Sequence, residues 1–187
     1  MVREGKITFA HKGRTMKREL LILRHGKSDW SKPVDDFHRP LKKRGRKSAV
    51  RMGAWMDGQG IVPEIILSSP AVRARETARL AAEGMHIAAE IIENPAIYEG
   101  GLDELLQIVR SLPKYVGRVL LVGHNTGIEE FVFYLAGGRV AIPANGKLMP
   151  TAALARFVVS GAWKKFGPDR AELVEIVRPR QLAEKSI

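Results

Sequence analysis

The stretch Leu20-Leu21-Ile22-Leu23-Arg24-His25-Gly26-Lys27-Ser28-Asp29-Trp30 decides the fold. Residues 20–23 are apolar, which predicts a buried strand at residues 19–23, and Arg24-His25-Gly26 follows it directly. In an open α/β sheet, ligands bind beyond the carboxyl ends of the strands. We therefore expect Arg24 and His25 at a ligand site.

Outward from this stretch, short apolar runs alternate with helical patterns. Further strands are expected at residues 64–67, 118–122, 153–159 and 173–177, and helices at 41–55, 71–81, 102–109 and 128–135. Strands that alternate with helices favour an α/β fold, with a mostly parallel central sheet and helices on both faces. The two late strands are expected to be antiparallel neighbours, and the longer loops to span 31–40 and 136–150.

The length of 187 residues predicts one domain, placed at residues 19–182, with a short tail at 183–187. Residues 1–18 are polar and basic without a period, so we expect a flexible N-terminal extension. The absence of cysteine excludes disulfides and thiolate catalysis, and it fits a reducing cytoplasm. No apolar stretch approaches ~20 residues, so no membrane partner is expected. The net charge of +11 favours anionic partners, such as nucleic acid or phosphorylated substrates.

Two further predicted strands also end in polar residues. One ends in Ser68-Ser69-Pro70, with Arg73 in the helix that follows, and the other in Gly123-His124-Asn125. Taken singly, these residues have ordinary explanations: Ser69 and Pro70 suit the start of a helix, as does Asn125 or Thr126. Taken together, they predict two histidines and two arginines at one edge of the sheet.

That combination matches the needs of a phosphoryl group. Arginine offers a fork that fits phosphate oxygens, and helix starts add partial positive charge. A neutral imidazole can attack phosphorus, and Arg24 and Arg73 are expected to lower the pKa of His25 and keep it neutral near pH 7. Gly26 is expected to let the backbone pass close to the bound group.

Three motifs resemble those of the histidine phosphatase superfamily, in the family's order: residues 20–30 with Arg24-His25-Gly26, residues 69–77 with Arg73, and residues 121–125 with His124. The resemblance spans residues 19 to about 180. The short length, Arg39-Pro40-Leu41 and the Gly-His-Asn form are similar to the SixA-like protein-phosphohistidine phosphatases. The resemblance implies a phosphoglycerate mutase-like three-layer sandwich.

The resemblance also implies roles. His25 would be the nucleophile and would form a phosphohistidine intermediate, while Arg24, Arg73 and His124 would bind and stabilise the transferring group. Ser28 would add a hydrogen bond to the phosphate or, equally, cap a turn. No cofactor and no metal are implied, and the substrate would be a phosphorylated protein or a small phosphate ester.

The acidic proton donor of the mutases and acid phosphatases has no clear counterpart. Glu99 is the nearby candidate, and its alternative is an exposed turn carboxylate; Glu76 and Asp29 are interpreted as structural. A missing donor favours a phosphohistidine substrate, because imidazole needs less protonation to leave than an alkoxide does.

Two other functions stay open at this stage. A mutase for small phosphorylated acids or sugars is disfavoured because few residues remain to enclose such a substrate. A non-catalytic anion-binding module, for example one associated with nucleic acid, is disfavoured by the set of Arg24, His25, Arg73 and His124. Specific nucleic-acid binding is not expected, and the sequence does not fix an oligomeric state.

Overall fold

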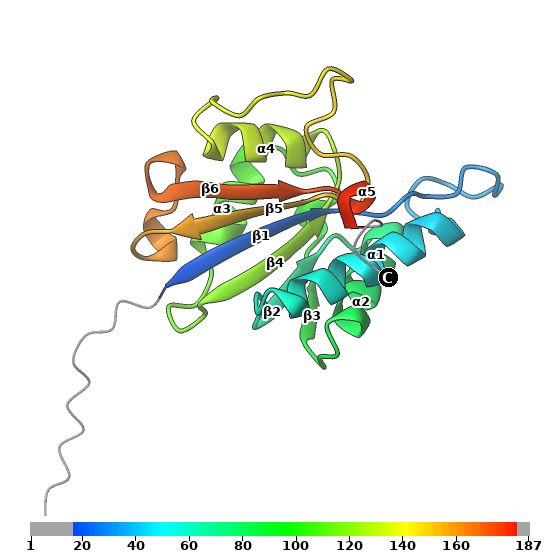
Figure 1. Cartoon of the computed structure of the whole chain (residues 1–187), viewed down its shortest axis with the longest axis horizontal. Coiled ribbons are helices and arrows are strands. Elements are labelled where there is room, and N and C mark those ends of the chain that lie inside the picture. The colour runs from blue at the N-terminus through cyan, green and yellow to red at the C-terminus, as the bar shows by residue number, and fades with distance from the viewer. Residues whose placement is uncertain (1–16, 183–187) are drawn as a thin grey trace, which may run out of the picture.

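A computed structural model describes residues 17–182 (Figure 1). Of the extension expected at residues 1–18, residues 1–16 lie outside the described residues, whereas Arg18 belongs to the first strand; the tail expected at 183–187 also lies outside the described residues. One sheet of six strands runs through the molecule in the order β3-β2-β4-β1-β5-β6. The strands are β1 (Arg18–Arg24), β2 (Ile65–Ser68), β3 (Glu90–Glu93), β4 (Arg118–Gly123), β5 (Leu154–Val159) and β6 (Ala171–Val177).

The sheet is mostly parallel, as predicted. β1 pairs in parallel with β4, β4 with β2, and β2 with β3, whereas β5 runs antiparallel to both β1 and β6. The expected antiparallel pairing of the two late strands is therefore confirmed. β3 was not predicted, because Glu-Ile-Ile-Glu is four residues long and mostly exposed at the edge of the sheet.

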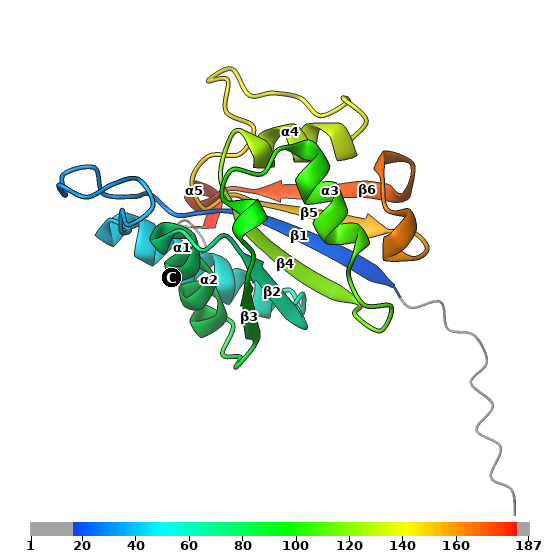
Figure 2. The same ribbon diagram turned by 180° about the vertical axis from the view of Figure 1, so that it is seen from behind.

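Helices cover both faces and complete the predicted three layers (Figures 1 and 2). They are α1 (Lys43–Gly58), α2 (Val72–Gly84), α3 (Leu102–Arg110), α4 (Gly127–Leu135) and α5 (Pro179–Leu182). α3 and α4 pack on the face that carries Leu20 and Ile22, and α1, α2 and α5 on the face that carries Leu21 and Leu23. Because successive side chains of a strand point to opposite faces, β1 needs an unbroken apolar run to serve both cores.

The start of α2 differs from the sequence prediction. The expected cap and first helical residue, Ser69 and Pro70, precede the helix, and the N-cap position falls at Ala71. The Ser69 hydroxyl accepts a hydrogen bond from the Ala71 N–H at 3.3 Å, which shapes the turn between β2 and α2. Thr126, one of the two predicted caps of α4, does hold the N-cap position, without a side-chain hydrogen bond.

Glu19 joins three strands at the edge of the sheet where β1 begins. Its side chain is almost completely buried, and its carboxylate pairs with Arg118 of β4 and Arg156 of β5. A buried charge is tolerated when opposite charges and hydrogen bonds surround it. These two arginines therefore allow an acid to lie inside the first strand.

Candidate active site

Three neighbouring strands deliver the polar residues to one edge of the sheet. β2, β4 and β1 lie side by side, and their carboxyl ends lead into Ser69, His124 and His25. These ends open into a cleft of about 420 Å³. The cleft is lined by Arg24, His25, Lys27, Ser28, Trp30, Asp36, Arg39, Arg73, Tyr98, Glu99, His124, Asn125 and Thr151. All five predicted phosphate-site residues, Arg24, His25, Ser28, Arg73 and His124, line this one cleft.

His25 is held in one tautomer by the backbone. Its ring is 8% exposed, and Nδ1 lies 2.7 Å from the carbonyl oxygen of Gly26. A carbonyl oxygen only accepts, so Nδ1 carries the proton and the neutral ring keeps a lone pair on Nε2. The ring centroid of His124 is 5.0 Å away, so the two imidazoles share the site. This geometry makes Nε2 of His25 a competent nucleophile.

Burial and neighbouring positive charge keep both imidazoles neutral. The pKa of His25 is lowered to about 3. Burial is the main cause, and the neighbouring His124, Arg73 and Arg24 contribute to the same shift. The sequence argument named the two arginines, whereas burial is the larger cause. Burial, followed by Arg73, also lowers the pKa of His124 to about 4. Both rings are therefore uncharged at neutral pH.

These shifts predict that the ring signals of His25 and His124 do not titrate between pH 5 and pH 8. A lowered histidine pKa means that the neutral form persists as the pH falls, until the pH approaches the shifted value. The measurement is ¹⁵N-detected NMR of the imidazoles, with His25→Asn and His124→Asn variants to assign the signals. A midpoint at or above pH 6 for either ring would contradict the prediction.

Gly26 has a structural role in addition to the one predicted for it. A Cβ at this position would lie 2.8 Å from the carbonyl oxygen of Gly45 in α1, so the glycine permits close approach of a helix. The Gly26 N–H donates to the hydroxyl of Thr77 at 2.9 Å, and that hydroxyl donates to the carbonyl of Arg73 at 2.6 Å. The loop that follows His25 is thereby tied to both α1 and α2.

Unsatisfied polar atoms concentrate in the cleft. Arg24 donates through Nη1 to the Met149 carbonyl at 2.7 Å, and Asn125 donates to the same oxygen at 3.2 Å. Nε of Arg24, Nε of Arg73 and Nδ1 of His124 are buried and have no partner among residues 17–182. Buried polar groups normally have partners, so such a group of atoms indicates a ligand. An oxyanion that accepts from the two guanidinium groups fits this arrangement.

Sequence reasoning missed a carboxylate in the cleft. Asp36 accepts hydrogen bonds from Nη2 of Arg73 at 2.7 Å and from the Tyr98 hydroxyl at 3.0 Å, and it pairs with Arg39. Partial burial opposes ionisation, but the hydrogen bonds from Tyr98 and Arg73 outweigh it and leave the pKa of Asp36 lowered. Asp36 is therefore ionised at neutral pH and orients Arg73. No signal marks this, since Asp36 lies in an aperiodic loop 37 residues before Arg73.

Aromatic side chains complete the walls of the cleft. Tyr98 packs edge-on against His124, with ring centroids 5.6 Å apart. The Arg39 guanidinium lies 3.3 Å from the ring centroid of Trp30, which is 70% exposed. Trp30 therefore lies at the mouth of the cleft and not in the core.

The three acidic residues considered in the sequence analysis differ in their positions relative to the cleft. Glu99 lines the cleft, as a proton donor would have to. Glu76 instead accepts from the Leu41 N–H at 3.0 Å and pairs with Arg46, and Asp29 accepts from the Ser31 N–H at 3.0 Å. Glu76 and Asp29 therefore have the structural roles predicted for them.

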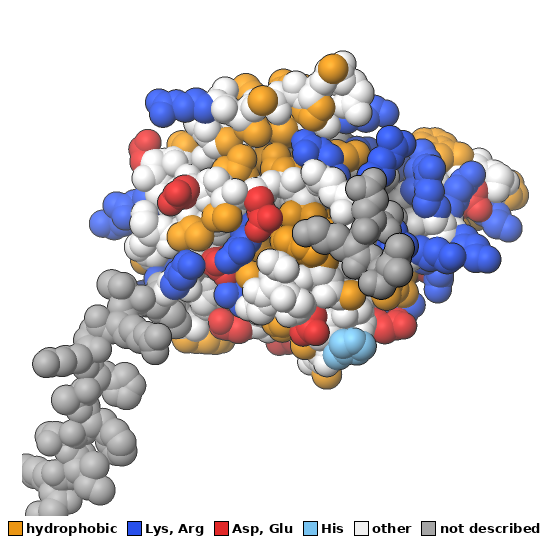
Figure 3. All heavy atoms as spheres, viewed as in Figure 1, with side chains coloured by type: hydrophobic (Ala, Val, Ile, Leu, Met, Phe, Trp, Pro, Cys, Tyr) orange, Lys and Arg blue, Asp and Glu red, His pale blue; other side chains and the backbone are white. Residues whose placement is uncertain are grey.

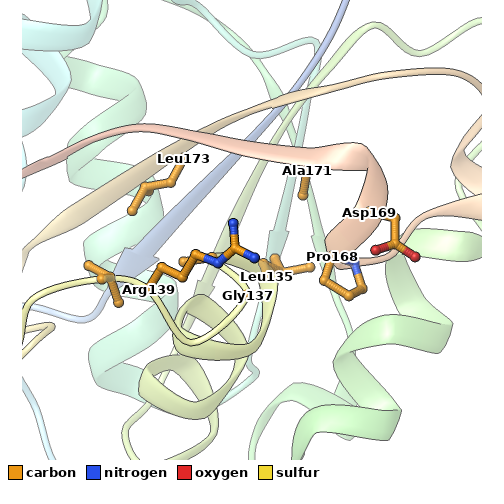
Figure 4. Close-up of a pocket in the computed structure, with 9 residues that line it drawn as sticks. Leu135, Gly137, Arg139, Pro168, Asp169, Ala171 and Leu173 are labelled. Atoms are coloured by element: carbon orange, nitrogen blue, oxygen red, sulfur yellow. The ribbon is translucent and has the colours of Figure 1, made fainter.

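A second cavity, of about 450 Å³, lies between the end of α4 and β6 (Figure 4). Its lining includes Arg139, Asp169 and Leu173 and no histidine, so it offers no nucleophile of this kind. Within residues 17–182, no group of three or more His, Asp or Glu side chains is arranged to hold a metal ion. The same residues contain no helix long and apolar enough to cross a membrane.

Comparisons with known proteins agree with this architecture. A protein of Arabidopsis thaliana described as uncharacterised and chloroplastic is 31% identical over 140 residues, which cover 68% of this chain and 63% of that protein, just under two thirds. An uncharacterised protein of Mycobacterium tuberculosis is 29% identical over 162 residues, covering 84% of this chain and all of that protein.

Solved structures extend the likeness to three dimensions. The structure of a putative phosphohistidine phosphatase SixA from Nakamurella multipartita superposes with a TM-score of 0.75 and 27% identity, covering 87% of this chain and 96% of the other. A protein histidine phosphatase SixA complexed with tungstate gives a TM-score of 0.74 at 21% identity, covering 88% and 99% of the two chains.

The family model described as "Histidine phosphatase superfamily (branch 1)" matches residues 20–107, which contain the first two motifs. The third motif, with His124, lies beyond this match and directly follows β4 of the same sheet. Residues 20–107 thus match the histidine phosphatase superfamily, and the chain shares the fold of the SixA-type structures.

Proposed function

We propose that this protein is a phosphatase in which His25 attacks phosphorus and forms a phosphohistidine intermediate. The observation that carries the proposal is the orientation of His25. Its Nδ1–H is donated to Gly26, and its Nε2 lone pair is free in a cleft where buried arginine nitrogens lack partners. Phosphoryl transfer to nitrogen requires a neutral nucleophile and positively charged groups around the transferring phosphoryl group.

The reaction proceeds in two displacements. In the first, the Nε2 lone pair forms a bond to phosphorus while the bond to the leaving group breaks and its electron pair departs with that group. In the second, a water oxygen attacks the phosphoryl group and the electron pair of the N–P bond returns to Nε2. The Gly26 carbonyl favours positive charge on the ring, so it supports the phosphorylated imidazole between the steps.

Arg24, Arg73 and His124 bind the equatorial oxygens in this mechanism. Asp36 accepts from Arg73 and orients its guanidinium, and Met149 does the same for Arg24. Ser28 is buried beside them and lines the same cleft. We infer that no metal takes part, because the fixed arginines supply the charge that a metal ion would otherwise contribute.

The substrate that suits this cleft is a phosphohistidine in a protein. Phosphohistidine with a proton on its other ring nitrogen leaves as neutral imidazole, so no strong acid is needed. Asp36 is ionised and engaged, which leaves Glu99 as the one carboxylate of the cleft free to protonate a leaving group. The similar structures are named putative phosphohistidine phosphatase SixA and protein histidine phosphatase SixA, and their shared fold supports this choice. A cytoplasmic location fits the absence of cysteine.

The test offers three substrates side by side: a phosphohistidine protein, a phosphoserine peptide and a small alkyl phosphate. We expect the highest kcat/KM on phosphohistidine. A clear preference for the alkyl phosphate would instead favour a small-molecule phosphomonoesterase of the same superfamily, the alternative that Glu99 keeps open.

Glu99→Gln distinguishes these two chemistries. If Glu99 is not a proton donor, the variant retains phosphohistidine hydrolysis within about twofold, because attack by His25 and the arginine clamp do not involve residue 99. A general acid would make its loss cost ~10²-fold or more on alkyl phosphates, whose leaving group needs a proton. Steady-state kinetics on both substrates, with circular dichroism as the folding control, makes the measurement. A loss above ~10²-fold on phosphohistidine would contradict the proposal.

A further inference from the structure

Positive charge is concentrated beside the cleft. Between Gly26 and Arg51 the chain has nine Lys and Arg residues against three Asp, so this stretch supplies +6 of the total +11. Six of these cations lie at the start of α1 and its cap, a segment that contains no acid and that we name the basic shoulder. The basic shoulder comprises Lys42, Lys43, Arg44, Arg46, Lys47 and Arg51, all exposed. Figure 3 shows Lys and Arg gathered over the end of the molecule where α1 and the 31–40 loop lie in Figure 1.

Helix stability does not explain this charge. The N-terminus of a helix carries partial positive charge, so cations there are unfavourable, and α1 has no acidic residue in its first turn. Lys42 pairs with Asp29 at 3.6 Å, and Arg46 pairs with Glu76. The remaining four cations of the basic shoulder have no carboxylate partner within residues 17–182. Lys43 and Arg44 lie in the first turn, where they oppose the helix dipole, so an external anion is the partner that these cations favour.

The basic shoulder contacts the loop that follows His25 directly. The Lys42 N–H donates to the Lys27 carbonyl at 2.8 Å, and a Cβ on Gly45 would lie 2.4 Å from that same oxygen. From Lys43 to Arg51 the helix extends ~12 Å away from this contact. A small phosphate ester bound beside His25 would not reach this far, whereas a macromolecule would.

Trp30 adds an apolar anchor on the same side. Its ring is 70% exposed, and Val34 on the following loop is 47% exposed. Exposed tryptophan and arginine are the residues most enriched among the energetically dominant contacts of protein interfaces. The mouth of the cleft therefore combines an aromatic anchor with a field of positive charge.

We propose that the basic shoulder and Trp30 form the docking surface for an acidic protein, whose phosphorylated side chain enters the cleft. This inference rests on the proposed function and names the partner of the same site. A nucleic acid fits less well, because Asp36 lines the cleft and the exposed Asp35 precedes it on the same loop, and both carboxylates would repel a continuous phosphate backbone. Discrete carboxylates on a folded partner can avoid these two positions. One face of Trp30 is also covered by Arg39.

The test uses two histidine-containing peptides of equal length, each phosphorylated with phosphoramidate, one with Asp and Glu flanks and one with Lys and Arg flanks. Wild type should hydrolyse the acidic peptide with a kcat/KM ~10-fold or more above that of the basic one, and the preference should fall with added salt. The double variant Lys43→Glu/Lys47→Glu, altered at two exposed positions one helical turn apart, should abolish this preference. Its hydrolysis of a chromogenic aryl phosphate should stay within about twofold of wild type.

The matched control is Lys164→Glu/Lys165→Glu. These exposed lysines follow β5, at the edge of the sheet opposite the cleft, so this variant should behave as wild type on all three substrates. Equal loss in both double variants would show a general charge effect and overturn the inference. Equal rates of wild type on the two peptides would also overturn it while leaving the phosphatase function intact.

Binding without catalysis separates failure of the two proposals. Fluorescence anisotropy of the dye-labelled, unphosphorylated acidic peptide measures its affinity for the docking surface whether or not phosphohistidine is hydrolysed. A failure to hydrolyse phosphohistidine would refute the proposed substrate but not the docking surface. Tighter binding to wild type than to Lys43→Glu/Lys47→Glu supports the docking surface. Binding no tighter than that of the basic peptide, or weaker than that of a single-stranded oligonucleotide of equal length, overturns it.

Discussion

Replacing His25 with Ala is expected to reduce phosphatase turnover by at least ~10³-fold, because the variant lacks the atom that attacks phosphorus. The arginines and His124 remain, so binding of inorganic phosphate should persist. Circular dichroism and the thermal midpoint control for folding, since His25 is buried and its Nδ1 proton satisfies the Gly26 carbonyl. His25→Asn, which keeps a polar side chain, should lose turnover equally.

The intermediate gives this prediction a direct chemical test. Brief incubation of wild type with ³²P-labelled substrate, followed by denaturation, should yield a phosphoenzyme that is stable to base and labile to acid, as a phosphoramidate is. Neither variant of His25 should retain the label. Label on a serine or an aspartate, or near-normal turnover in His25→Ala, would refute the assignment of the nucleophile.

Arg73→Lys should lower kcat/KM by ~10²-fold or more, which is the cost of removing one fixed donor from a developing oxyanion. Lysine retains the charge but not the planar fork. The fork is used on two sides here, since Nη2 binds Asp36 while Nε is buried and free for a ligand. The variant therefore loses both the orienting contact and the donor.

Arg75→Lys is the matched control for that experiment. Arg75 is two residues further along α2, is exposed, and reaches Glu93 at 3.5 Å. Its replacement should change kcat/KM by less than about threefold, a size typical of surface charge pairs. If both variants lost activity equally, Arg73 would not be the arginine that contacts the phosphoryl group.

Much of the fold was predictable because local pattern and global packing agree. Strands buried on both faces need continuous apolar runs, and residues 20–23 and 119–122 are such runs. The edge strand β3 escaped detection because its Glu-Ile-Ile-Glu sequence is exposed and too short for a period to appear. The start of α2 was placed too early, since Ser69 and Pro70 have cap chemistry but shape a turn instead.

The residues of the candidate site were also predicted only in part. His25, Arg73 and His124 follow predicted strands, so topology alone brings them to one edge of the sheet. Asp36 and Tyr98 lie in segments without periodicity, and their hydrogen bond joins positions 62 residues apart. The local sequence of neither segment predicts the hydrogen bond between Asp36 and Tyr98. The basic run at residues 42–51 is visible in the sequence, but its contacts with Gly26 and Lys27, which place it beside His25, are not.

The clamp around Glu19 has a consequence for how the chain reaches its folded state. β1 is the first strand of the sheet along the chain, yet the arginines that neutralise its acid lie 99 and 137 residues later. Closing such long loops is costly in entropy, and contacts of this range slow folding. During synthesis, β1 must wait for β4 and β5 before its charge can be buried. The cleft that holds the two histidines is therefore completed only when most of the sheet has formed. A partly folded chain does not contain a functional part of this cleft.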